Sequence, residues 1–241
     1  MVTVLLVRHG RTAANADGGL AGRSPVELDE TGRLQATGLR ERLAGVPLAA
    51  VVTSPLPRCR QTVALALPEA VPAVEDRLVE CGYGDWQGRP LKELVEDPLW
   101  PVVQQHPSAA RFPGPDGEAM AEMAARAVAA VREWDRKVAA EHGPHAVWLA
   151  CSHGDVIKAI VADALGLHLD QFQRIVVDPG SVTAIRYTPT RPFLLKLSDT
   201  GELRFDPPPE PAGGAGPAGG EGSDAAVGGG TGGGSFGKVE A

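Results

Sequence analysis

Short apolar runs separated by polar turns give this chain its main pattern. Three of these runs occupy residues 2–7, 49–53 and 145–151. Each is short enough for a buried strand and is followed by a segment with helical spacing of apolar residues. A brief edge strand is expected at 71–74, and three further strands at 174–177, 181–187 and 192–198. This order predicts a three-layer α/β/α sandwich with a mostly parallel central sheet.

The helices between the strands have recognisable beginnings and ends. The first is expected to begin near Asp29 or Thr31 and to stop at Gly45, with its leucines at 34, 39 and 43 turned toward the core. The second follows the run at 49–53 directly.

Ser54 is expected to cap this second helix, with Pro57 just inside its start, and Pro68 closes it. A long helix is expected at about 118–141. Its apolar stripe comprises Met120, Met123, Ala127, Val131, Trp134 and Val138. Such a stripe indicates core packing rather than a cofactor site. Residues 89–112 are irregular and predict short helices that cover a pocket, as lids do.

Composition divides the chain near residue 205. Residues 206–241 are rich in glycine, proline, alanine and acids and have few large apolar side chains. Such a segment buries too little surface to offset its ordering entropy, so it predicts a disordered tail after a folded domain at 1–205.

Charge and cysteine content exclude several classes of protein. The formal net charge of −7 argues against a nucleic-acid partner. No stretch approaches the roughly 20 apolar residues of a membrane span. Cys59, Cys81 and Cys151 are widely spaced, which argues against disulfides or a zinc site and favours the cytoplasm. Phosphate-loop and dinucleotide fingerprints are missing from the sequence, so no cofactor or metal is expected.

Charged and polar residues follow the predicted strands at their carboxyl ends. Arg8 and His9 end the first run, Arg58 opens the helix after the second, and His153 follows the third. Ligands bind at this edge of open α/β sheets. Guanidinium groups match phosphate oxygens, and a neutral imidazole can attack phosphorus.

Four motifs together resemble the histidine phosphatase superfamily, also called phosphoglycerate-mutase-like. They are Leu5-Leu6-Val7-Arg8-His9-Gly10-Arg11-Thr12-Ala13-Ala14-Asn15, Ser54-Pro55-Leu56-Pro57-Arg58-Cys59-Arg60-Gln61-Thr62, Leu78-Val79-Glu80 and Ser152-His153-Gly154. The likeness extends through about residue 190. It implies a phosphohistidine intermediate on His9, phosphate held by Arg8, Arg58 and His153, and Glu80 as proton donor.

Transfer of a phosphoryl group from a monoester requires the residue types found in these motifs. Fixed positive donors must surround the transferring group, and Arg8, Arg58 and a protonated His153 fit that need. His9 fits the nucleophile, with its second ring N–H tied to a backbone carbonyl. Glu80 fits the acid that protonates the leaving alkoxide and later the base that activates water.

Further expectations concern the surroundings of these groups. Thr12, Asn15 and the Gly154 N–H are additional phosphate donors in this interpretation. The two arginines should lower the pKa of Glu80, so Glu80 is expected to act as an acid chiefly when substrate is bound. Taken singly, each residue has an ordinary explanation: a surface ion pair for Arg58, a solvated acid for Glu80, a core histidine for His153.

The sequence leaves three functions open. A phosphatase is favoured over a phosphoglycerate mutase, because residues 82–88 are similar to the short phosphatase branch and lack the longer insertion of the mutases. A phosphate-ester-binding protein without turnover is the third. Ala119 stands where that branch commonly has serine, which removes a hydroxyl near the site. The expected substrate is a small phosphorylated metabolite, and the oligomeric state stays open.

Overall fold

A six-stranded sheet forms the centre of the molecule. The computed structural model describes residues 2–201. The strands are β1 (Val2–Arg8), β2 (Leu48–Thr53), β3 (Ala73–Val74), β4 (Val147–Ser152), β5 (Val182–Tyr187) and β6 (Pro192–Asp199). Their order in the sheet is β3-β2-β4-β1-β5-β6. The first four strands pair in parallel and the last two are antiparallel, so the predicted mostly parallel sheet is confirmed.

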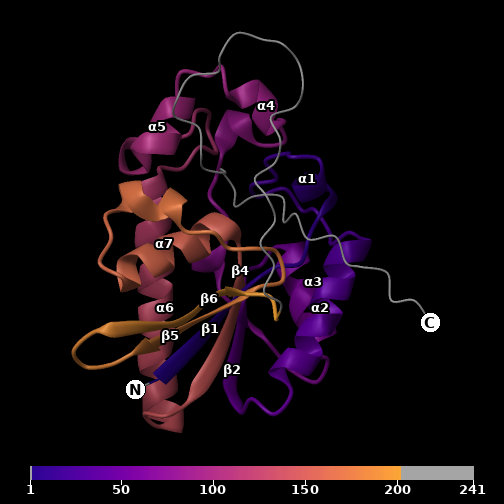
Figure 1. Cartoon of the computed structure of the whole chain (residues 1–241), viewed down its shortest axis with the longest axis vertical. Coiled ribbons are helices and arrows are strands. Elements are labelled where there is room, and N and C mark those ends of the chain that lie inside the picture. The colour runs from indigo at the N-terminus through magenta and orange to yellow at the C-terminus, as the bar shows by residue number, and fades with distance from the viewer. Residues whose placement is uncertain (1, 202–241) are drawn as a thin grey trace.

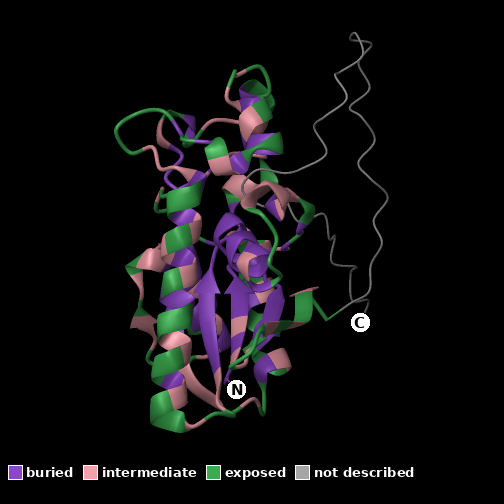
Figure 2. Ribbon diagram, turned by 90° about the vertical axis from the view of Figure 1, so that its left-hand side faces the viewer, coloured by how far each residue is buried: buried purple, intermediate pink, exposed green. Residues whose placement is uncertain are grey.

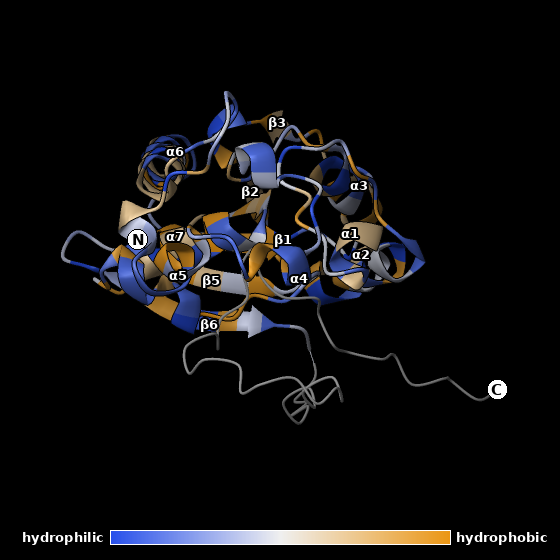
Figure 3. Ribbon diagram, turned by 90° about the horizontal axis from the view of Figure 1, so that it is seen from above, coloured by the Kyte–Doolittle hydropathy of each residue, from blue (hydrophilic) through white to orange (hydrophobic). Residues whose placement is uncertain are grey.

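Helices cover both faces of this sheet. The α-helices are α1 (Ala13–Ala16), α2 (Glu30–Leu43), α3 (Pro57–Ala66), α4 (Leu91–Leu94), α5 (Trp100–Gln105), α6 (Met120–His142) and α7 (Gly154–Ala164). Short 3₁₀ helices lie at Asp76–Leu78, Gly84–Trp86, Pro107–Ala109 and Leu169–Arg174. Seen from above, α6 and α7 lie on one side of the sheet and α2 and α3 on the other (Figure 3). The three-layer prediction is therefore confirmed. No helix within residues 2–201 is long and apolar enough to cross a membrane.

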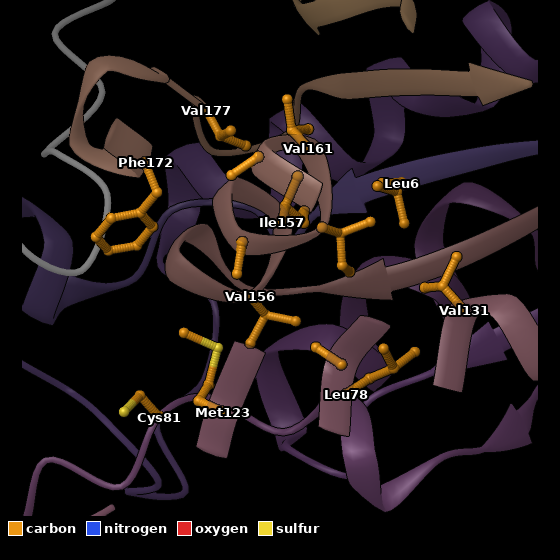
Figure 4. Close-up of a cluster of buried hydrophobic side chains, with 14 of the residues drawn as sticks. Leu6, Leu78, Cys81, Met123, Val131, Val156, Ile157, Val161, Phe172 and Val177 are labelled. Atoms are coloured by element: carbon orange, nitrogen blue, oxygen red, sulfur yellow. The ribbon is translucent and has the colours of Figure 1, made fainter. Parts of the chain in front are cut away.

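The core has two parts, one on each face of the sheet. The larger lies under α6 and α7, and Leu6 of β1, Met123 of α6 and Ile157 of α7 all belong to it (Figure 4). The predicted stripe of the long helix packs here, and α6 exposes its opposite face to solvent (Figure 2). The smaller part packs α2 and α3 on the sheet through Leu39, Val63 and neighbouring residues.

Three local expectations are wrong. Leu34 is 59% exposed, because the buried stripe of α2 follows Ala36, Leu39 and Leu43 at helical spacing and Leu34 lies off that stripe. Ser54 does not cap α3, which begins at Pro57 after an N-cap at Leu56.

The third error is the strand expected at 174–177. Ile175 and Val177 are buried and Val176 is exposed, so the alternation of the sequence is real. This segment is not one of the described strands, and the alternation arises because only one of its sides is buried. The Val177 carbonyl accepts a hydrogen bond from Arg8.

Short helices gather at the carboxyl edge of the parallel strands. Figure 1 shows α1, α4 and α5 at the same end of the molecule, and a backbone bridge joins Gly19 to Pro90. The prediction of short helices at 89–112 is confirmed, and Trp100 and Phe112 within it are buried. The boundary at 205 and the tail at 206–241 lie outside the described residues.

Candidate active site

Parallel pairing of β1 with β4 brings two histidines together. Arg8 and Ser152 are paired at the ends of these strands, so His9 and His153 leave the sheet side by side. Their ring centroids are 5.2 Å apart with the rings edge to face. The sheet topology thus joins motifs that are more than 140 residues apart in sequence.

Hydrogen bonds fix the tautomer of His9. Its Nδ1 lies 2.7 Å from the Gly10 carbonyl oxygen and donates to it, which leaves a lone pair on Nε2. Burial and the charges of Arg58 and Arg8 lower the pKa of His9 well below its ordinary value. Gly10 has no room for a side chain, since a Cβ there would lie 2.3 Å from the Gly32 carbonyl oxygen. His9 is therefore a neutral imidazole held in one orientation.

Arg58 lies between the two histidines. Its Nε is 3.2 Å from His9 Nε2 and 3.2 Å from His153 Nδ1, so one N–H is shared by both rings. Its Nη atoms donate to the backbone carbonyls of Gly22 and Ser24. Arg58 is 2% exposed, which places a buried positive charge directly beside the Nε2 lone pair of His9.

Arg8 adds a second buried guanidinium. It is 1% exposed, and its Nη1 donates to the Val177 carbonyl at 2.6 Å. Burial lowers its pKa, and the carboxylates of Glu80, Asp155 and Asp178 oppose that shift. The site therefore contains two buried arginines, Arg8 and Arg58, and nearby carboxylates offset part of the cost of burying Arg8.

The surroundings of His153 favour its neutral form in the absence of a ligand. Burial, followed by the charge of Arg58, lowers its pKa well below the ordinary value. Its Nδ1 accepts from Arg58, and its Nε2 donates to Ser54 Oγ at 2.7 Å. Ser54, expected as a helix cap, instead holds the ring of His153.

Glu80 is a buried carboxyl group whose pKa is raised to about 7. Burial is the largest cause and Asp155 adds to it, whereas Arg58, Arg8 and the hydrogen bond from Cys81 N act in the opposite direction. The expectation that the arginines would dominate is wrong, because a carboxyl group that is 4% exposed loses most of its hydration. Glu80 thus has access to both protonation states near neutral pH without a ligand.

The segment that carries Glu80 is held by arginines from other elements. Arg126 of α6 donates to the backbone carbonyls of Arg77, Val79 and Glu80 at 2.7, 2.7 and 3.2 Å. Arg23 donates to the Glu80 carbonyl as well, at 3.2 Å. No local pattern in the sequence reveals these contacts, because they join segments that are distant along the chain.

An open pocket of about 440 Å³ lies in front of these groups. His9, Arg58, Glu80, Thr12 and Asn15 line it, together with residues 18–22, Ala14, Tyr83 and Leu91. Arg8, His153 and Gly154 are buried behind this lining. The structure therefore brings the predicted residues to one place, in two layers.

Thr12 and Asn15 are engaged with each other. Thr12 Oγ1 donates to Asn15 Oδ1 at 3.0 Å and accepts from Asn15 N at 3.3 Å, which caps α1. Their local role is thus to fix the turn that forms one rim of the pocket.

Three polar residues near the site had no role in the sequence interpretation. The Tyr83 hydroxyl donates to Asp155 Oδ2 at 2.7 Å, and Lys158 Nζ lies 3.9 Å from Asp155 Oδ1. All three side chains are buried. The available signal was an acid and a lysine three residues apart in the first part of a mostly apolar helix.

Ala119 is not among the residues that line the pocket. It is the N-cap residue of α6, and Glu122 accepts a hydrogen bond from its backbone N–H. Within residues 2–201, His, Cys, Asp and Glu side chains form no group that could hold a metal ion.

Comparison with known proteins places this site in a family. The sequence model of the histidine phosphatase superfamily (branch 1) matches residues 4–200. The chain is 30% identical over 209 residues to phosphoserine phosphatase 1 of Hydrogenobacter thermophilus, covering 84% of this chain and 95% of that protein. It is also 30% identical over 183 residues to 2,3-bisphosphoglycerate-dependent phosphoglycerate mutase 2 of Gloeobacter violaceus, covering 74% and 82%.

Solved structures agree with the sequence comparison. The α-ribazole phosphatase of Shigella flexneri superposes with a TM-score of 0.68 at 25% identity, covering 85% of this chain and all of that one. The chain belongs to branch 1 of the histidine phosphatase superfamily.

Proposed function

We propose that this protein hydrolyses phosphate monoesters through a phosphohistidine intermediate on His9. One observation carries the proposal: the Nε2 lone pair of a neutral His9 borders the same pocket as Glu80, whose pKa is raised to about 7. Hydrolysis requires two reactive groups. One is a nucleophile that accepts the phosphoryl group, and the other is an acid whose pKa is near neutral pH.

In the first step His9 Nε2 attacks phosphorus and the bond to the leaving oxygen breaks. The charge on the transferring oxygens is met by Arg58 and Arg8, which replace water with fixed donors. In this proposal the phosphoryl group binds next to the Arg58 Nε–H, which lies 3.2 Å from a nitrogen of each ring. A phosphate dianion favours the imidazolium form of His153, which then becomes a further donor.

Glu80 supplies the proton that the leaving alkoxide takes up. As a carboxylate it then accepts a proton from the water that attacks the phosphohistidine. Inorganic phosphate leaves, and both His9 and Glu80 return to their starting protonation states. A pKa of about 7 suits both halves of this cycle.

Hydrolysis is favoured over mutase chemistry by the loop after Glu80. Residues 82–84 pack directly on the loop before α6: a Cβ on Gly84 would lie 1.8 Å from the Pro113 carbonyl oxygen, and Glu118 N donates to the Gly82 carbonyl at 2.8 Å. The loop is thus short and tightly packed, and the proposal takes it as the loop of the phosphatase branch, without the longer insertion that the resemblance associates with mutases. The substrate in this proposal is a small phosphorylated metabolite of the cytoplasm.

Two assays test the proposal. Purified protein should release phosphate from p-nitrophenyl phosphate, and His9→Ala should abolish that release. Coupled conversion of 3-phosphoglycerate to 2-phosphoglycerate, faster than phosphate release, would favour the mutase. Phosphate binding without turnover of any ester would favour the binding protein.

A further inference from the structure

The residues that line the pocket form two chemically different groups. His9, Arg58 and Glu80 are the ionisable ones among those with a role in the proposed reaction, and the part of the pocket that they line is called the phosphoryl end. The remaining wall consists of glycines, Asn15 and Thr12, and apolar surface. That apolar surface is supplied by Ala14, Leu20, Ala21, Tyr83 and Leu91. Among the described residues that line the pocket, His9 and Arg58 are the basic ones, and both belong to the phosphoryl end.

We propose that this wall selects esters whose alcohol part is uncharged and has an apolar face, and disfavours esters that carry a carboxylate. The inference rests on the proposed phosphatase activity and names the substrate class of the same site. A carboxylate held against such a wall loses hydration without gaining an ionic partner, which is costly. Leu20 and Leu91 instead gain contact with an apolar group.

Arginines near the rim are already engaged in the structure. Arg23 pairs with Glu118 at 2.9 Å and donates to the Glu80 carbonyl. Arg11 pairs with Asp29 at 2.8 Å and donates to Thr31. Either arginine would have to give up these bonds to reach a carboxylate in the pocket.

Glu80 adds to the discrimination. A substrate carboxylate in the same pocket would repel the ionised form of Glu80. The Glu80 carboxylate would in turn weaken the binding of that substrate. A 3-phosphoglycerate ion therefore brings its carboxylate into the same pocket as Glu80, and the described wall around its alcohol part offers that carboxylate no basic side chain.

Matched pairs of esters test the inference directly. Glycerol 3-phosphate and 3-phosphoglycerate differ by a hydroxymethyl group in place of a carboxylate, and phenyl phosphate and 4-carboxyphenyl phosphate differ by one carboxylate. We expect kcat/KM to favour the uncharged member of each pair by about tenfold or more. Equal values, or a preference for the carboxylates, would overturn the inference.

A charge placed on the wall gives the second arm of the test. Ala14 of α1 lines the pocket, whereas Ala13 beside it is exposed and lies outside the lining. Ala14→Lys should raise kcat/KM for 3-phosphoglycerate relative to glycerol 3-phosphate by roughly three- to tenfold. Ala13→Lys adds the same charge on the solvent side and should leave the ratio near the wild-type value. An unchanged ratio in Ala14→Lys would contradict the assignment of the wall.

The proposed activity and this inference fail in different ways. If phenyl phosphate is not hydrolysed at all, the phosphatase proposal is wrong. If phenyl phosphate is hydrolysed but the carboxylated esters are equally good substrates, only the inference about the wall is wrong.

Discussion

Burial decides the protonation of the reactive side chains at the residue scale. His9 and His153 lie beside two arginines, and loss of hydration acts in the same direction as those charges, so the pKa of both rings falls. For Glu80 the two effects oppose each other, and burial is the larger. The same low-dielectric site therefore keeps two bases uncharged and an acid poised near neutrality.

Asp155 should affect the alkaline limb of the pH profile. It is the nearby charge that raises the pKa of Glu80, while Arg8, Arg58 and Lys158 provide the positive charges around the two acids. The substitution Asp155→Asn removes this negative charge and should lower the pKa of Glu80. Glu80 then loses the proton that it needs as an acid at a lower pH. The alkaline limb of kcat/KM for an alkyl phosphate should move to lower pH than in wild type.

The control for this shift lies on the same helix. Asp163→Asn removes a carboxylate at the far end of α7, where it pairs with Arg132, and should leave the limb in place. A limb that stays fixed in Asp155→Asn would mean that Asp155 has no influence on the acid.

At the element scale, the local sequence predicted most strands and helices because burial imposed a clear period on them. Two of the errors occurred at residues that make contacts distant in sequence. Ser54 has the chemistry of a helix cap, yet its hydroxyl binds His153 at the end of β4. The segment at 174–177 has the alternation of a strand but sits outside the sheet ladder.

The N-terminus of α6 offers a stability prediction at this scale. Ala119 has the extended backbone of an N-cap residue, and Glu122 already makes one half of a capping box with it. Ala119→Ser adds the missing hydroxyl, which should stabilise the protein by about 1 kcal/mol in urea unfolding.

A matched substitution separates capping from composition. Ala125→Ser places the same residue on an exposed position inside α6 and should destabilise the protein slightly, because serine is a poorer helix former than alanine. Equal effects of the two substitutions would argue against the capping explanation.

The candidate site depends on the whole molecule. Sequence motifs pointed to Arg8, His9, Arg58, Glu80 and His153, and the parallel order of β2, β4 and β1 explains why their positions converge. The sequence could not give the protonation of His153 or Glu80, since both depend on how deeply the completed fold buries them. The contacts of Arg126 with the Glu80 segment depend in the same way on α6 docking across it.

Burying Glu80 should cost the protein stability at alkaline pH. Its folded pKa of about 7 lies above the unfolded value, so the folded state holds the proton more tightly between roughly pH 4.5 and 7. Stability is lost as pH rises through that window, by about 3 kcal/mol in total. Glu80→Gln should therefore be more stable than wild type at pH 8, and the difference should shrink toward pH 5.

Urea unfolding of both proteins across this range measures the difference. Glu141→Gln, an exposed change at the end of α6, serves as the control and should show no comparable trend. A difference between Glu80→Gln and wild type that does not change with pH would show that the carboxyl group is not held protonated.

Trapping the phosphoenzyme tests the central claim most directly. In Glu80→Gln, p-nitrophenyl phosphate still transfers its phosphoryl group, because the nitrophenolate leaves without a proton, whereas water attacking the intermediate has lost its base. After acid-free quenching of a reaction with ³²P-labelled ester, we expect alkali-stable, acid-labile label on His9 and none in His9→Ala. Label on another residue, or turnover that persists in His9→Ala, would contradict the account.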